Sequence, residues 1–189
     1  EHGRCPREKT MNSKTIPIAV INPDAPTESL EAKQPTIDNG AEIYNKDGYF
    51  SAEYMQREWD KVWTESWLIA GVTTDLQAPG DYFLFRVRSE SIIVTQTEEG
   101  VKAFYNVCPH RGSRLLTEER GNKKVFVCPF HSWSFRNNGE LRTITDEETF
   151  QDPVICHRPG LTPVACEEHA GLIFVSMSDT PPTLKDAIG

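Results

Sequence analysis

The chain has 189 residues and a formal net charge of −8, from 28 acidic and 20 basic side chains. Its hydrophobic content of 38% and aromatic content of 10% suffice for one domain with a core plus a tail. The charge argues against a nucleic-acid partner, whose phosphates would repel it, and no apolar run has the length of a membrane helix.

Residues 1–40 are predicted to form an extended N-terminal arm. They are poor in aromatic residues and contain Pro17, Pro23, Pro26 and Pro35, a composition typical of segments without a core. Residues 1–10 precede Met11 and are interpreted as a possible remnant of expression. No apolar signal core is present, and the odd number of five Cys implies no disulfide framework, so we expect a cytoplasmic protein.

A helix is predicted over residues 51–63. Ser51 can cap its start, and apolar residues recur at helical spacing. We expect the Trp residues of this helix to pack in the core. The apolar positions are Tyr54, Met55, Trp59, Val62 and Trp63.

From residue 67 onward the pattern is one of short strands separated by turns. Such a pattern predicts a mainly β fold with antiparallel sheets in a sandwich or barrel. A cluster-binding subdomain of about residues 106–144 is expected to be inserted into the larger sheet. The predicted strands are Trp67–Val72, Tyr82–Val87, Ser91–Gln96, Val101–Val107, Lys124–Val127, Ser132–Arg136, Glu140–Thr143 and Leu172–Met177, and a turn is predicted at Gly121-Asn122.

Two short loops carry the strongest chemical signal. Cys108-Pro109-His110 and Cys128-Pro129-Phe130-His131 each offer one thiolate and one imidazole. Two Cys and two His form the ligand set of a Rieske [2Fe–2S] cluster. Zinc also takes two Cys and two His, but zinc fingers usually pair Cys with Cys and His with His. A zinc-binding interaction module and a chance arrangement are the alternatives.

The charge balance explains this ligand set. Two ferric ions, two sulfides and two thiolates sum to zero, so an added electron meets less repulsion than in an all-Cys cluster. The potential then lies at roughly −150 to +300 mV instead of about −400 mV. Cys108 and Cys128 are expected to hold the inner iron, and His110 and His131 the outer iron.

A second C-x-x-H pattern occurs at Cys166-Glu167-Glu168-His169, just after Cys156-His157. It has no C-x-H partner, because Cys156 and His157 are adjacent. We predict that these residues belong to a surface loop and bind no metal.

The sequence around the two loops resembles the α-subunit of Rieske non-heme iron ring-hydroxylating oxygenases. The resemblance covers about residues 42–189. It rests on Phe104-Tyr105-Asn106-Val107-Cys108-Pro109-His110-Arg111-Gly112 and on Val127-Cys128-Pro129-Phe130-His131-Ser132-Trp133, with flanking similarity at Glu58–Trp67 and Ala170–Met177.

The resemblance implies a Rieske-type β-sandwich at residues 41–180 and a further catalytic domain with mononuclear Fe(II), beginning at about 181–189. Electrons from NAD(P)H would arrive through a reductase or ferredoxin, and the second iron would activate O₂ for hydroxylation or demethylation. The full-length form would be a homotrimer or hetero-oligomer. The five His leave no triad for that iron, so the chain is interpreted as truncated and competent only for electron transfer. A free-standing Rieske ferredoxin is the alternative.

Six further residues near the candidate ligands have expected roles, three of them by comparison with Rieske families. Ser132 stands where the family more often has Gly, so a different local backbone is expected there. Ser113 and Phe130 occupy the Cys positions of cytochrome-complex proteins, which excludes their disulfide. The expected supporting residues are Gly112, which gives the first loop room, Trp133, which excludes water, and Arg111, which either balances the cluster's charge or is simply solvated.

Overall fold

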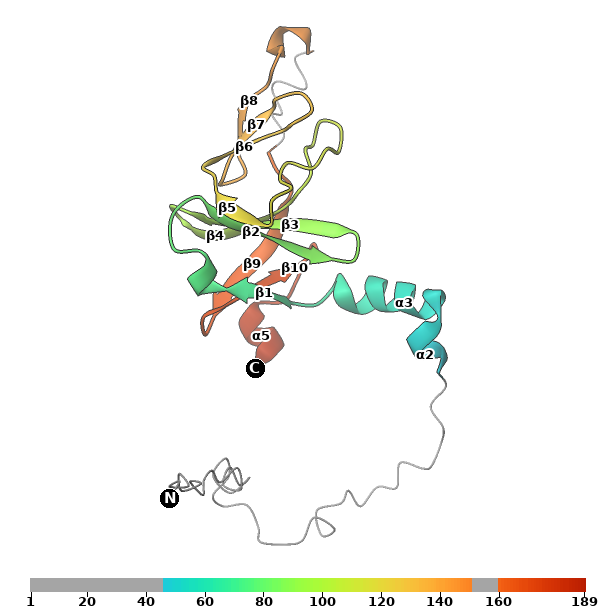
Figure 1. Cartoon of the computed structure of the whole chain (residues 1–189). Helices are drawn as coiled ribbons and strands as arrows, with labels where there is room; N and C mark the ends of the chain where they lie inside the picture. Colours follow the sequence, from blue (N-terminus) through green and yellow to red (C-terminus); the bar gives the residue numbers. More distant parts are fainter. Residues whose placement is uncertain (1–45, 151–159) are drawn as a thin grey trace, which may run out of the picture. The chain divides into compact units, whose positions relative to one another are not determined.

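Ten β-strands dominate the computed structural model, which describes residues 46–150 and 160–189 (Figure 1). The strands confirm the predicted mainly β fold, and every pairing between them is antiparallel. The predicted arm at residues 1–40 lies outside the described residues, as do Cys156 and His157.

Seven strands form one large sheet in the order β1-β10-β9-β4-β3-β2-β5. The sheet curls so that β1 approaches β2, where the Gly71 backbone lies against the Phe83 ring. Their bounds are β1 Leu68–Val72, β2 Asp81–Val87, β3 Glu90–Thr97, β4 Gly100–Tyr105, β5 Arg120–Asn122, β9 Pro163–His169 and β10 Leu172–Ser176.

Alternation along the strands divides the core into two parts. On β2, Tyr82 and Leu84 belong to a first hydrophobic cluster, whereas Phe83 belongs to a second one. On β3, Ile93 belongs to the first cluster and Ile92 to the second. Since successive strand residues point to opposite faces, both faces of this sheet are covered by apolar packing. The first cluster also contains Cys108 and Cys128, so the candidate site is continuous with the hydrophobic core.

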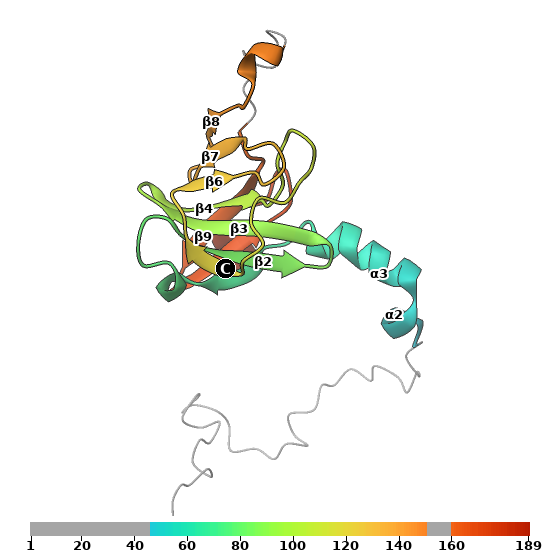
Figure 2. The ribbon, with the colours of Figure 1, turned by 45° about the horizontal axis from the view of Figure 1, so that its top comes forward.

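A second sheet of three short strands stands beside the large one. It consists of β6 Val125–Val127, β7 Ser134–Arg136 and β8 Leu141–Thr143. Figures 1 and 2 show it beyond β3 and β4. Phe126 and Phe135 are fully buried and belong to the first hydrophobic cluster, which joins the two sheets.

Two sequence predictions about strands were wrong. The predicted turn at Gly121-Asn122 is part of β5, a three-residue edge strand whose residues are all exposed and which therefore has no apolar pattern. The predicted surface loop around Cys166 is part of β9, whose pairing with β10 and β4 the polar sequence does not reveal.

The predicted helix at residues 51–63 is confirmed as α3, Ala52–Glu58, followed by a π-helical turn, Trp59–Trp63. The Ser51 hydroxyl accepts a hydrogen bond from the Tyr54 N–H (3.2 Å) and caps it, as predicted. The prediction that its Trp residues lie in the core was wrong. Trp63 is 45% exposed, and Trp59 packs against the Arg88 guanidinium, 5.2 Å from the ring centroid.

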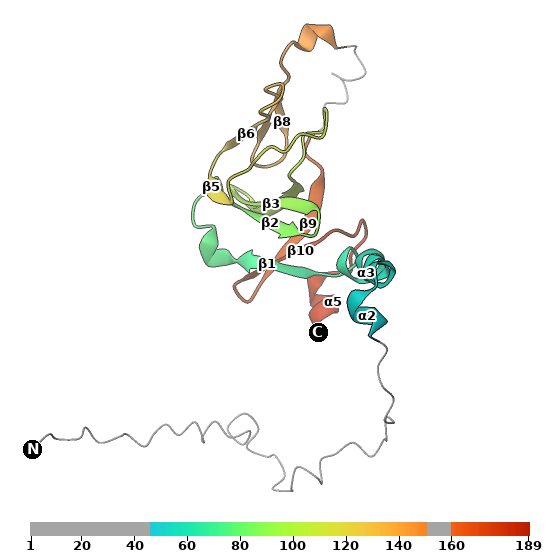
Figure 3. The same cartoon turned by 45° about the vertical axis from the view of Figure 1, so that its right-hand side comes forward.

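Four further short helical segments complete the described part. They are α2 Asp47–Phe50, α5 Leu184–Ile188 and the 3₁₀ turns Thr73–Asp75 and Glu147–Thr149. Figures 1 and 3 show α5 on the side of the large sheet away from the small sheet. None of the helices within residues 46–150 and 160–189 has the length and apolar character needed to cross a membrane.

Candidate metal centre

The first candidate loop connects β4 to β5 and is closed by two backbone hydrogen bonds. The Cys108 N–H donates to the Ser113 carbonyl (2.8 Å), and the Gly112 N–H donates to the Cys108 carbonyl (2.9 Å). Gly112 has φ +72°, and a Cβ at this position would meet no atom within 4 Å. Glycine is therefore favoured here for its left-handed backbone, not for space within the protein itself.

The second loop, between β6 and β7, is closed by an equivalent pair of backbone hydrogen bonds. The Cys128 N–H donates to the Trp133 carbonyl (2.8 Å), and the Ser132 N–H donates to the Cys128 carbonyl (3.0 Å). Ser132 has φ +60°, the same region as Gly112. The prediction of a different backbone at Ser132 was wrong: the paired hydrogen bonds hold the serine in the conformation that a glycine would adopt.

The two cysteines lie side by side in the core. Each is 2% exposed, and the thiols are close enough to interact with one another. Burial opposes ionisation of Cys128, but hydrogen bonds from the backbone N–H groups of Phe130 and His131 and from the side chains of Cys108 and Ser113 together outweigh it and hold its pKa below the usual value. Burial raises the pKa of the Cys108 thiol, although the N–H groups of His110 and Arg111 act against this. Both loops thus aim N–H donors at a sulfur, an arrangement that stabilises bound thiolates.

The two imidazoles come together from different loops. The ring centroids of His110 and His131 are 4.7 Å apart. The Nδ1 atom of each ring is buried and has no hydrogen-bond partner. Burial, helped by the charges of His131 and Arg111, lowers the pKa of His110. A buried ring nitrogen without a partner is rare in folded proteins and is what a metal-ligating, neutral His presents.

Aromatic rings surround the two His unequally. Trp133 is 2% exposed and stacks flat on His110, with a centroid distance of 4.6 Å and an interplanar angle of 5°. Phe150 contacts the rings of His110 and Trp133 edge-on. His131 instead packs against Phe130, which is 58% exposed. Trp133 is therefore buried beside a candidate ligand, and its role in excluding water stays a prediction. Phe150 was missed, because a single Phe after an acidic segment carries no chemical signal.

The geometry suits a group larger than one ion. Within the described residues, no three His, Cys, Asp or Glu side chains are placed to share a single metal ion. The loops offer two buried thiols and two unpartnered ring nitrogens, which is the donor set of a two-iron cluster with mixed ligation. Arg111 is exposed, and its charge acts on His110.

The second C-x-x-H segment is built differently. Cys166 and His169 lie in β9, opposite Val175 and Leu172 of β10. Residues three apart on a strand point to opposite faces, so these two side chains do not converge. Burial, reinforced by the charges of Glu168 and Glu167, raises the pKa of Cys166 to about 12, which disfavours the thiolate that a metal needs.

Comparisons with known proteins identify the domain that contains these two loops. The model of the Rieske [2Fe–2S] domain matches residues 66–158. The oxygenase subunit of glycine betaine monooxygenase from Chromohalobacter salexigens is 32% identical over 171 residues, which are 90% of this chain and 37% of that protein. The large oxygenase component of naphthalene 1,2-dioxygenase from Pseudomonas aeruginosa is 35% identical over 140 residues, which are 72% of this chain and 31% of that protein.

Solved structures give the same relationship. A quaternary ammonium Rieske monooxygenase that oxidises carnitine superposes with a TM-score of 0.70 at 30% identity, covering 75% of this chain and 39% of that one. Naphthalene 1,2-dioxygenase with bound phenanthrene superposes with a TM-score of 0.68 at 33% identity, and the match covers 73% of this chain and 32% of that one. The chain therefore spans between about a third and two fifths of the length of these relatives.

Proposed function

Because the chain carries a Rieske [2Fe–2S] domain homologous to those of Rieske oxygenase large subunits, we propose that it holds the cluster through Cys108, His110, Cys128 and His131 and serves as a one-electron carrier. The observation that carries this assignment is the pair of buried, unpartnered Nδ1 atoms beside two buried cysteines. When bound, the cluster supplies reversible one-electron storage at a potential raised by mixed ligation.

The protein's own groups prepare this site in three ways. Backbone N–H groups at Phe130 and His131 act on the Cys128 sulfur and favour its thiolate. Burial lowers the pKa of His110 and so favours the neutral imidazole that can ligate. Trp133 lies flat against that imidazole and keeps water from one side of it.

In the wider proposal, residues 41–180 are the Rieske domain of an oxygenase α-subunit, with 106–144 as the cluster-binding part. A reductase or ferredoxin would supply electrons, and a mononuclear iron in a catalytic domain following about residues 181–189 would receive them, in the same or a neighbouring subunit. The related quaternary ammonium Rieske monooxygenase is described as transferring electrons between subunits, which supports this arrangement. Helix α3, joined to the sheet framework through Trp59 and Arg88, favours this over a free-standing ferredoxin, in which we expect little beyond the framework.

The deciding experiment is a visible absorption and low-temperature EPR spectrum of the purified chain, as isolated and after dithionite. We expect a red-brown protein whose reduced form gives a rhombic signal of low average g, with two iron atoms per chain. A colourless protein that contains zinc would contradict the proposal.

The limit of the chain's activity has its own test. With reductant, O₂ and quaternary ammonium or aromatic substrates, residues 1–189 alone are expected to give no oxygenated product. Product formation by this chain would contradict the assignment of catalysis to a separate domain.

A further inference from the structure

The two candidate His ligands have different surroundings. His110, Trp133 and Phe150 form a closed group of three rings. Phe150 meets His110 edge-on at 5.9 Å and 75°, and meets Trp133 edge-on at 5.5 Å and 71°. With Trp133 stacked on His110 at 4.6 Å, each ring contacts the other two. Edge-to-face and stacked pairs at these distances are attractive, so the group fixes the plane of the imidazole.

Among the described residues, His131 has no comparable aromatic cover. Its aromatic neighbours there are His110 and Phe130, and Phe130 is 58% exposed. Phe130 therefore lies beside His131 without sealing it from water, whereas Phe150 closes a group of three rings at His110.

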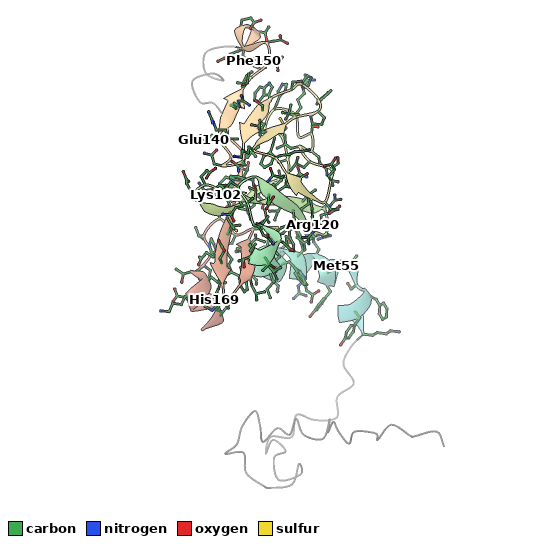
Figure 4. All side chains as sticks on the ribbon, turned by 60° about the vertical axis from the view of Figure 1, so that its left-hand side comes forward. Met55, Lys102, Arg120, Glu140, Phe150 and His169 are labelled. Atoms are coloured by element: carbon green, nitrogen blue, oxygen red, sulfur yellow. The ribbon has the colours of Figure 1, made fainter. Side chains whose placement is uncertain are left out.

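Local structure after β8 presents Phe150 to this position. Asp146 takes a left-handed conformation (φ 56°) and starts the 3₁₀ turn Glu147–Thr149. The Thr149 hydroxyl donates to the Asp146 carbonyl (2.7 Å), and the Phe150 N–H donates to the Glu147 carbonyl (3.1 Å). Phe150 then packs against the hydrophobic cluster that contains both cysteines and Trp133. Figure 4 shows it at the end of the molecule beyond the small sheet.

We propose that Phe150 is a positioning residue that closes the aromatic group over His110 and keeps water from that side of the cluster. The proposal rests on the proposed function, because it takes His110 as an iron ligand. Reduction adds one negative charge, and an apolar cover disfavours that charge relative to water. Phe150 should therefore hold the reduction potential lower, and the cluster's lifetime longer, than an open site would allow.

The test is a redox titration of the parent chain and of three variants, followed by visible absorption. F150A is expected to shift the potential upward, because water reaches His110. F150L keeps an apolar cover and is expected to restore the parent potential. F50A is the control and is expected to leave the potential unchanged, because Phe50 is 82% exposed and lies in α2, outside both ligand loops.

A second readout is the rate of bleaching in the presence of an iron chelator. F150A is expected to lose the cluster roughly 10-fold faster than the parent, as for other outer-shell substitutions. Parent values for F150A in both assays would overturn the proposal, and so would an equal shift of potential in F50A or F150L. If F150A assembles no cluster, F150Q replaces it, since it keeps bulk near the ring but admits polarity.

The ligand assignment and the role of Phe150 can be refuted separately. A parent chain without a Rieske spectrum refutes the ligand assignment, and with it the role of Phe150. A parent chain with the spectrum and an F150A variant of unchanged potential refutes the role of Phe150 alone.

Discussion

The pattern C-x-x-H occurs twice in this chain, once in a turn and once in a strand. In the turn, Cys128 and His131 are held by the bond from the Cys128 N–H to the Trp133 carbonyl, which folds the segment back on itself. In β9, Cys166 and His169 pair with β10 and point to opposite faces. The comparison shows that a metal-binding pattern has meaning only with the backbone that makes its side chains converge.

The two cysteines also differ in electrostatics. Cys128 is buried and Cys166 is partly buried. Hydrogen bonds to the Cys128 sulfur, first among them those of the Phe130 and His131 N–H groups, outweigh burial and lower its pKa. Cys166 has two neighbouring glutamates that reinforce burial and raise its pKa to about 12. One site is prepared for a thiolate, and the other keeps a neutral thiol.

The largest expected effect comes from exchanging these cysteines one at a time. Cys128→Ser should abolish the cluster, because an alcohol is a poor replacement for an iron-ligating thiolate. Iron content and visible absorption measure the loss. Cys166→Ser and His169→Ala are the matched controls, and both should keep the parent iron content. Loss of the cluster in either control would remove the distinction between the two segments.

The next effect concerns the charge of the ligand set. His110→Cys or His131→Cys should lower the reduction potential of any cluster that assembles, toward the roughly −400 mV of all-Cys clusters, because each adds a negative thiolate. Redox titration measures it. An unchanged or raised potential in an assembled variant would refute the assignment of that His as a ligand.

Much of the fold could be read from the sequence, because the strands around the core alternate regularly. β2, β3, β4 and β10 carry fully buried residues at defined positions and were predicted within one or two residues. β5 and β9 were missed for a physical reason. β5 carries no buried side chain and β9 only one, so their backbone hydrogen bonds to neighbours, rather than an apolar pattern, define them.

The candidate ligands could be predicted because residue type alone decides their chemistry. The residues around them could not be predicted equally well. Phe150 is 19 residues from His131 in sequence and meets the ring group only through the fold. The helical spacing of Trp59 and Trp63 predicts a buried face, yet α3 and the turn after it contain no buried residue. Periodicity predicts the helix but does not say what covers it.

The raised pKa of Cys166 predicts that the stability of the chain depends on pH. The pKa of Cys166 is about 12 in the folded chain and lies near 8.5 in an unfolded one. Below the unfolded value both states hold the proton, so the contribution to stability is fully present. Above about pH 9 only the unfolded thiol loses its proton, so the free energy of unfolding falls by roughly 1.4 kcal/mol per pH unit.

Urea unfolding of the cluster-free parent and of C166A between pH 8 and pH 10.5 isolates this effect, because other titrating groups cancel in the difference. The advantage of the parent over C166A should be constant up to about pH 8.5 and then shrink. An advantage that does not change with pH would contradict the raised pKa.

The smallest expected effect tests the frame that the two loops share. Gly112 and Ser132 occupy equivalent positions, with φ +72° and +60°. A left-handed backbone costs a residue with a side chain roughly 1–2 kcal/mol, whereas glycine loses about 0.5–1 kcal/mol more chain entropy on folding. Ser132→Gly should therefore stabilise the cluster-free chain by about 0.5 kcal/mol.

Gly112→Ser is the reciprocal change and should destabilise the chain by a similar amount. A Cβ at Gly112 meets no atom within 4 Å, so the backbone conformation alone sets its effect. Urea unfolding of both variants at neutral pH measures the pair. Opposite signs of similar size would show that the loops are equivalent in backbone energetics and differ only in their side chains. Equal signs would show that neighbouring contacts, not the shared left-handed turn, decide which residue each loop accepts.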